Sequence, residues 1–138
     1  MNWVAAYSAA SGFAVGFLAA WFVAWWHERQ RAASHLRGML FRIGKDLYYS
    51  NAQPFNILDP IYLDLMDAIW SYHRFSFPWK RKAFLAAGFD LIGHNPKTRH
   101  RHCHAYPDRQ KAYDLTEKLL GFVGCPYETY TPAPTPKE

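Results

Sequence analysis

The chain has 138 residues, of which half are hydrophobic and a fifth are charged, with a formal net charge of +5. Two cysteines are too few for a disulfide framework, so the composition excludes a small secreted domain held together by disulfides. The 16 basic and 11 acidic residues all follow position 26. The chain therefore divides into a charge-free N-terminal segment and a basic remainder that is long enough for one small core.

Residues 1–26 predict a transmembrane anchor. The apolar run from Trp3 to Trp26 has 24 residues, and a helix needs about 20 to cross the hydrocarbon core of a bilayer. Tryptophans lie at both ends of the run, as expected for side chains that favour the headgroup level. A cleaved signal peptide would begin with basic residues and have a shorter apolar stretch. Because the run has neither property, we expect a retained single span.

The distribution of charge predicts how the anchor is oriented. No lysine or arginine precedes it, whereas Arg29, Arg31, Arg37, Arg42 and Lys45 follow it closely, against one glutamate. Lysine and arginine are retained on the cytoplasmic side of a membrane. We therefore expect the N-terminus outside and the remaining domain in the cytoplasm, in a bacterial inner membrane.

Small residues recur at every fourth position of the anchor, at Ser8, Gly12, Gly16, Ala20 and Ala24. Small side chains let membrane helices approach closely and gain dispersion contacts, because lipid offers no hydrophobic drive for association. Small residues are also common in membrane helices that have no partner. We interpret the unbroken series as a helix-packing face, for a second copy of this chain or for another membrane protein.

The rest of the chain predicts an all-α cytoplasmic domain of about four helices over 27–124 and a flexible, proline-rich tail over 125–138. Helices are expected from His27 to Tyr49, from Asp59 as N-cap with Pro60 at the first position, from Pro78 to Gly88 or Gly93, and from Pro107 to about Phe122. The residues expected to face the core are Leu36, Leu40, Ile43, Leu47, Ile61, Leu65, Ile69, His73, Phe84, Leu85, Phe89, Ile92, Ala112, Leu115 and Leu119. Asp64 and Asp67 are expected on a solvated helix face.

Three basic stretches are expected to lie on anionic lipid or to contact phosphate groups. Each basic residue near an anionic leaflet contributes about 1 kcal/mol, and tryptophan suits the headgroup region. The residues are Arg29, Arg31, Trp79, Lys80, Arg81, Lys82, Lys97, Arg99 and Arg101. Nucleic-acid binding would use the same charges. It is the weaker alternative, because no zinc-finger, RNA-recognition or recognition-helix motif accompanies them.

A histidine-rich stretch offers a second alternative, a metal site. His100, His102 and His104 alternate along the sequence, so an extended chain would place them on one side and Cys103 on the other. Zinc takes three or four such ligands, and three in a straight row cannot converge without a remote fourth group. We expect no cofactor, with zinc at these residues as the alternative.

The sequence lacks the common motifs of enzymes, since it contains no phosphate-binding glycine loop, nucleophile elbow or zinc-hydrolase motif. It predicts a non-enzymatic accessory or adaptor protein that associates through its transmembrane face and docks a basic domain on the cytoplasmic membrane surface. Such a protein would be a small subunit or modulator of a membrane complex. A membrane-tethered metal-binding protein or enzyme, and a tethered nucleic-acid binder, stay open as alternatives.

Overall fold

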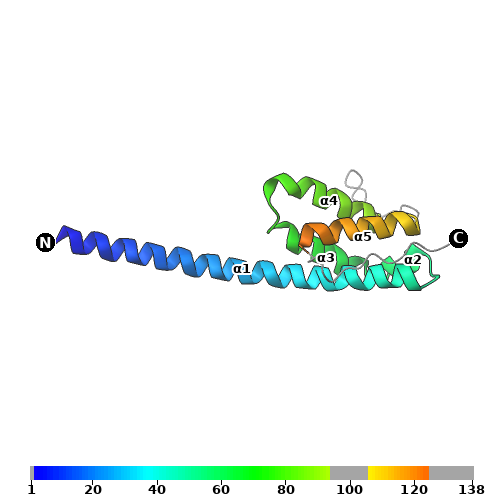
Figure 1. Ribbon diagram of the computed structural model, residues 1–138, viewed down its shortest axis with the longest axis horizontal. Helices are drawn as coiled ribbons and strands as arrows, with labels where there is room; N and C mark the ends of the chain where they lie inside the picture. The colour runs from blue at the N-terminus through cyan, green and yellow to red at the C-terminus, as the bar shows by residue number, and fades with distance from the viewer. Residues whose placement is uncertain (1, 94–105, 125–138) are drawn as a thin grey trace. The chain divides into compact units, whose positions relative to one another are not determined.

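The computed structural model describes residues 2–93 and 106–124, and within these ranges every regular element is an α-helix (Figure 1). The helices are α1 (Trp3–Tyr49), α2 (Pro54–Leu58), α3 (Tyr62–His73), α4 (Pro78–Ile92) and α5 (Arg109–Val123). The prediction of an all-α chain is therefore confirmed for the described residues. The chain divides into two compact units, Met1–Arg31 and Ala32–Glu138, and α1 contributes residues to both.

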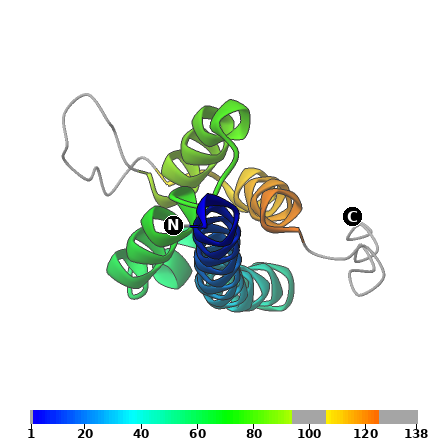
Figure 2. The same ribbon diagram turned by 90° about the vertical axis from the view of Figure 1, so that its left-hand side faces the viewer.

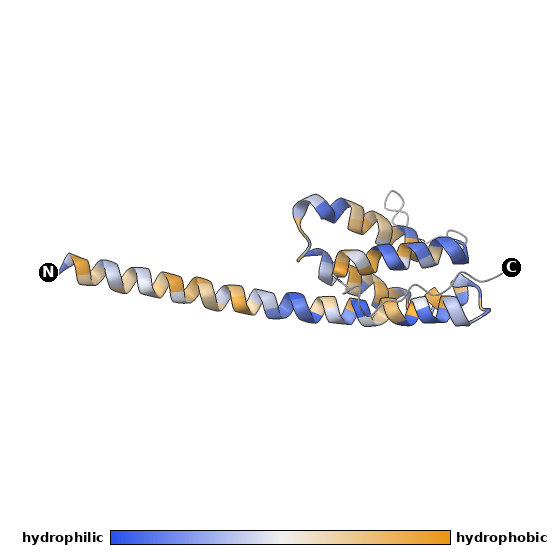
Figure 3. Ribbon diagram, in the orientation of Figure 1, coloured by the Kyte–Doolittle hydropathy of each residue, from blue (hydrophilic) through white to orange (hydrophobic). Residues whose placement is uncertain are grey.

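The first unit contains the apolar part of α1. Its most apolar 18-residue window has a mean hydropathy of 1.5, and none of that window is buried. In Figure 3 most of this part of the helix is orange, pale or light blue, whereas the remainder of α1 carries stretches of deep blue. By length and composition, α1 is the one helix in the described part of the chain that is able to cross a membrane. The predicted boundary between residues 26 and 27 stays a prediction.

The second unit has a hydrophobic core to which α1, α3, α4 and α5 all contribute, and the helices lie around this shared interior (Figure 2). The predicted row of Leu36, Leu40, Ile43 and Leu47 on α1 is fully buried. These residues recur at intervals of three and four, so they form one stripe along the helix. The largest side chains buried opposite this stripe include Leu65, Ile69, Phe84, Leu91, Ile92 and Leu119.

The predicted start of the second expected helix is wrong. α3 begins at Tyr62, and its N-cap is Ile61 rather than Asp59. Asp59 has helical backbone angles, and its N–H donates to the carbonyl of Phe55, so it ends the short helix α2 that the sequence did not predict. An N-cap residue has extended backbone angles instead. Asp59 and Pro60 therefore belong to the connection between two helices.

Of the two glycines offered as the end of α4, the second is correct. Gly93 has the left-handed φ of 66°, and its N–H donates to the carbonyl of Phe89, which ends the helix. α5 begins at Arg109 rather than at Pro107, because the side chain of Asp108 accepts a hydrogen bond of 2.8 Å from the N–H of Lys111. Sequence alone located both helices to within a few residues.

Burial on α4 and α5 differs in part from the predicted rows. Phe89 and Leu115 are only half-buried, whereas Leu91 and Thr116 are fully buried. α4 packs against both α3 and α5, so its buried surface is wider than a single stripe. The hydroxyl of Thr116 is satisfied within its own helix, where it donates to the carbonyl of Ala112 at 2.8 Å.

Side-chain hydrogen bonds to other parts of the chain hold both ends of α5. At its start, Arg109 donates to the carbonyls of Ser50 and Ala52, at 2.5 and 2.6 Å, in the connection that follows α1. At its end, the hydroxyl of Tyr72 donates to the carbonyl of Phe122 at 3.1 Å. The guanidinium of Arg37 approaches the next carbonyl, that of Val123, at 3.4 Å. A positive charge at a helix C-terminus is favourable, so these contacts fix α5 against α1 and α3.

Candidate functional site

The small residues of the first unit form an inclined ridge, not a straight face. All five, from Ser8 to Ala24, are exposed. Each step of four residues advances about 40° around an α-helix, so the series turns through about 160° between its ends. A ridge of this kind matches a partner helix that crosses at a right-handed angle of about −40°. Gly12 and Gly16, near the centre, lie where two crossing backbones would come closest.

Two serines, Ser8 on the ridge and Ser11 beside it, have their hydroxyls satisfied within the helix. The hydroxyl of Ser8 donates to the carbonyl of Ala5, and that of Ser11 donates to the carbonyl of Ser8, each at 3.0 Å. A polar group without a hydrogen-bond partner costs several kcal/mol when it lies in hydrocarbon. The two serines are thus compatible with an apolar surrounding.

The ridge has open space at its centre. A Cβ atom built on Gly12 or Gly16 would have no atom of the described structure within 4 Å, apart from the neighbouring backbone of the helix. A Cβ atom at either position therefore meets no other side chain of the described residues, and we expect the effects of larger side chains there to report on contacts with another molecule.

Aromatic rings surround the first cation after the apolar run. The guanidinium carbon of Arg29 lies 5.3 Å from the ring centroid of Trp26 and 6.0 Å from that of Trp25. The ring of Phe22 lies 5.9 Å from Trp25 and 6.3 Å from Trp26. Cation–π contacts of this kind contribute about 0.5–2 kcal/mol. A cation beside tryptophan rings suits the headgroup level of a bilayer.

A second exposed group of aromatic and basic side chains lies at the start of α4, and we name Phe77, Trp79, Lys80 and Lys82 the α4-start surface. The rings of Phe77 and Trp79 stack in parallel at 4.9 Å, yet their exposed fractions are 48 % and 74 %. Both lysines are exposed. Two large apolar rings thus lie in solvent beside two cations.

Arg81, which the sequence groups with these lysines, lies differently. Its Nε donates to the carbonyl of Ser76 at 3.0 Å, and its Nη2 donates to that of Arg74 at 3.3 Å. The guanidinium therefore binds the connection between α3 and α4. Burial, and then the positive charge of Arg81, lower the pKa of the nearby His73. Arg81 thus contributes to the local structure behind the α4-start surface.

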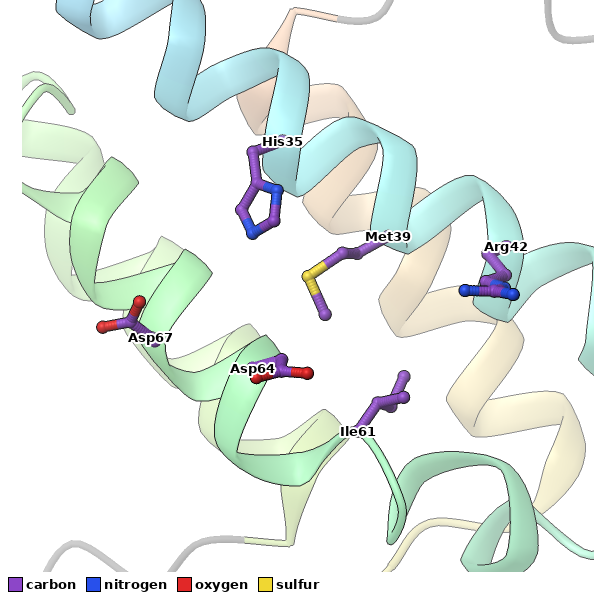
Figure 4. Close-up of a pocket in the computed structure, with 6 residues that line it drawn as sticks. All are labelled: His35, Met39, Arg42, Ile61, Asp64 and Asp67. Atoms are coloured by element: carbon purple, nitrogen blue, oxygen red, sulfur yellow. The ribbon is translucent and has the colours of Figure 1, made fainter.

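A polar pocket of about 430 Å³ lies between α1 and α3 (Figure 4). Its lining residues are His35, Met39 and Arg42 from α1 and Ile61, Asp64 and Asp67 from the start of α3. In Figure 4 His35 and Met39 extend from α1 toward α3, with Asp64 on the facing side. The solvated aspartates of the sequence analysis are indeed exposed, but they also form one wall of this pocket.

Sequence reasoning missed the pocket. The available signal was the spacing of His35, Met39 and Arg42, at intervals of four and three on one helix, next to the buried leucine row. That spacing shows that the three share a face. It does not show which other helix lies opposite them.

The remaining predicted site residues lie outside the described ranges. They are Lys97, Arg99, Arg101, His100, His102, Cys103 and His104. Within residues 2–93 and 106–124, no three His, Cys, Asp or Glu side chains form a group that would hold a metal ion.

The comparisons with known proteins found no match. No family model fits the chain, and no curated protein and no solved structure is significantly similar to it.

Proposed function

We propose that this chain is a single-pass, non-enzymatic accessory protein whose anchor packs against another membrane helix. The observation that carries the proposal is the exposed small-residue ridge, centred on Gly12 and Gly16, on a helix segment without any charge. Close backbone approach across such a ridge is a main source of helix association in lipid. The partner is a second copy or a subunit of a membrane complex, which this protein would modulate.

The second part of the proposal concerns the basic domain, which docks on the cytoplasmic surface of the same membrane, with the N-terminus outside. The α4-start surface supports this docking. Its exposed Phe77 and Trp79 rings suit the headgroup region, and Lys80 and Lys82 would each gain about 1 kcal/mol beside anionic lipid. Of the two alternatives, metal binding depends on His100, His102, Cys103 and His104, whereas nucleic-acid binding would use the same basic residues as docking on lipid.

The packing proposal is tested by substituting the ridge with bulky side chains. The full chain is purified from native membranes in a mild detergent, as wild type and as Gly12→Leu/Gly16→Leu. We expect a membrane protein or a second copy to co-purify with the wild type and to be lost from the variant, while membrane insertion is unchanged. Equal recovery from both proteins would exclude the ridge as the contact.

The matched control is Ala10→Leu/Ala14→Leu. These alanines have the same spacing as the two glycines but lie about 200° around the helix from them, and they are also exposed. We expect this variant to retain the partner. Loss of the partner from both double variants would mean that added bulk, and not the ridge, disrupts association.

The docking proposal is tested by hydrogen exchange at the first turn of α4, with the full chain in nanodiscs. We expect slower exchange when the discs contain anionic lipid than when they contain only zwitterionic lipid. Lys80→Gln/Lys82→Gln should remove this difference, while Lys111→Gln/Lys118→Gln on α5 should keep it. The same exchange in both kinds of disc would argue against docking by this surface.

A further inference from the structure

The pocket between α1 and α3 has walls of opposite charge that do not neutralise each other. Arg42 and His35 lie on the α1 wall, and Asp64 and Asp67 lie on the α3 wall. None of the four side chains makes a hydrogen bond or an ion pair within the described part of the chain. Four ionisable residues thus line one hollow of about 430 Å³, a volume within the usual range of small-molecule sites.

The two apolar lining residues of the pocket are anchored on the core. Met39 and Ile61 are both half-buried and pack against the core cluster. The hollow continues along α1 past Gly38, where a second depression of about 300 Å³ is lined by Ser34, Gly38 and three residues of the first. A Cβ atom at Gly38 would meet nothing within 4 Å, so space remains there for part of a bound molecule.

The charge arrangement selects the class of ligand. A simple cation beside the two aspartates would leave Arg42 without a counter-charge, and a simple anion beside Arg42 would lie opposite two carboxylates. A metal ion is not favoured, because the described residues hold no group of three metal-ligating side chains. A molecule that carries both an ammonium and an anionic group satisfies both walls with charge-assisted hydrogen bonds.

We propose that this pocket binds a phosphoethanolamine group, with the ammonium at Asp64 and Asp67 and the phosphate at Arg42. A phosphate offers more acceptor oxygens than a carboxylate, so it can accept from both Arg42 and His35. The ethylene carbons lie over Met39 and Ile61. The group is either a free solute or the headgroup of a phospholipid. The site lies wholly within the second unit, so it does not depend on a partner helix.

The test is calorimetric titration of the full chain in an uncharged detergent with phosphoethanolamine. We expect saturable binding by the wild type. Phosphocholine should bind about tenfold more weakly, because its trimethylated nitrogen donates no hydrogen bond to a carboxylate. Inorganic phosphate and ethanolamine should each bind more weakly than the joined molecule. The proposal is overturned if the wild type does not bind phosphoethanolamine, or if it binds phosphocholine equally well. These titrations need no substituted protein.

Two variants test which wall of the pocket binds the phosphate and which binds the ammonium. Arg42→Gln and Asp64→Asn/Asp67→Asn should each weaken phosphoethanolamine binding by about tenfold, while Asp90→Asn, an exposed carboxylate on α4, should leave it unchanged. The substituted side chains are exposed and make no hydrogen bond or ion pair with the described residues, so folding should persist, and circular dichroism checks it. Unchanged affinity in both pocket variants would overturn the assignment.

A final comparison identifies the source of the group. In nanodiscs, phosphatidylethanolamine that enters the pocket should reduce the binding of free phosphoethanolamine relative to phosphatidylcholine discs. Equal binding in the two kinds of disc identifies the free solute as the ligand. Both results retain the proposed chemistry.

Discussion

A Cβ atom placed on Gly88 would lie 3.1 Å from Cγ2 and 3.2 Å from Cδ1 of Ile69, so α4 packs on α3 at this point without room for a side chain. Both residues are buried. Glycine inside a helix costs about 1 kcal/mol relative to alanine. The contact with Ile69 explains why α4 nevertheless continues through Gly88 to its end at Ile92.

We expect Gly88→Ala to destabilise the protein by about 1 kcal/mol. The substitution gains about 1 kcal/mol of helix propensity, but overpacking of a core costs about 1–3 kcal/mol. We expect the cost of overpacking to exceed the gain in helix propensity, because Ile69 is fully buried and β-branched and so has little freedom to move away. Chemical denaturation of the full chain in an uncharged detergent, followed by circular dichroism, measures the change.

Gly121→Ala is the matched control, because Gly121 also lies inside a helix but a Cβ atom there would meet nothing within 4 Å. Here the propensity gain is unopposed, so we expect stabilisation by up to about 1 kcal/mol. Stabilisation by both substitutions would show that Ile69 is able to shift.

Arg109 joins the start of α5 to the connection after α1, and its loss should lower the free energy of unfolding. It donates to the carbonyls of Ser50 and Ala52. Removing hydrogen bonds from a charged donor to half-buried acceptors costs about 2 kcal/mol, which we expect for Arg109→Ala. Arg109→Lys should recover only part of this, because an ammonium does not offer the forked donors of a guanidinium.

The same denaturation measurement checks this prediction, and Lys118→Ala is its control. Lys118 is exposed on the same helix, so its substitution should change stability by less than about 0.5 kcal/mol. Full recovery in Arg109→Lys would mean that the charge, and not the paired geometry, is what stabilises the junction.

Asp108 should stabilise α5 as its N-cap. Its carboxylate accepts from the N–H of Lys111 at 2.8 Å. Loss of such a cap costs about 1 kcal/mol, whereas asparagine caps about as well as aspartate. We therefore expect Asp108→Ala to be destabilised by about 1 kcal/mol and Asp108→Asn to stay close to the wild type. Equal losses in the two variants would assign the effect to charge and not to capping.

The position of His73 makes stability depend on pH. Burial and the charge of Arg81 lower the pKa of His73 from its ordinary value of 6.5. Above that value the imidazole is neutral in both the folded and the unfolded chain. As the pH falls below it, the unfolded chain takes up the proton first, so stability decreases until the folded pKa is passed.

We expect the difference in unfolding midpoint between about pH 8 and about pH 5 to be smaller in His73→Gln than in the wild type. Arg81→Gln should reduce it in part, because it removes the second cause of the shift. Denaturation curves of the three proteins at both pH values make the comparison. An identical pH dependence in wild type and His73→Gln would contradict the role of His73.

Local features of the sequence predicted much of the fold. The charge-free run from Trp3 to Trp26 revealed a helix long and apolar enough to span a membrane, because length and hydropathy are properties of a segment by itself. The spacing of Leu36, Leu40, Ile43 and Leu47 predicted the buried stripe of α1 for the same reason. Gly93 was among the predicted helix ends because a left-handed position favours glycine.

Contacts between distant residues decided the rest. Gly88 is a possible helix end by sequence, and its place inside α4 is understood only once Ile69 is seen beside it. The correction at Asp59 is a local one, because its N–H bonds to the carbonyl of Phe55, four residues earlier. The pocket combines His35, Met39 and Arg42 with residues of α3, which periodicity along either helix does not reveal. Sequence pattern predicted α1, α3, α4 and α5, though not α2, and it predicted the buried stripe of α1. Only the tertiary structure decided which stripes meet, because the register between packed helices depends on the shapes of side chains far apart in the chain.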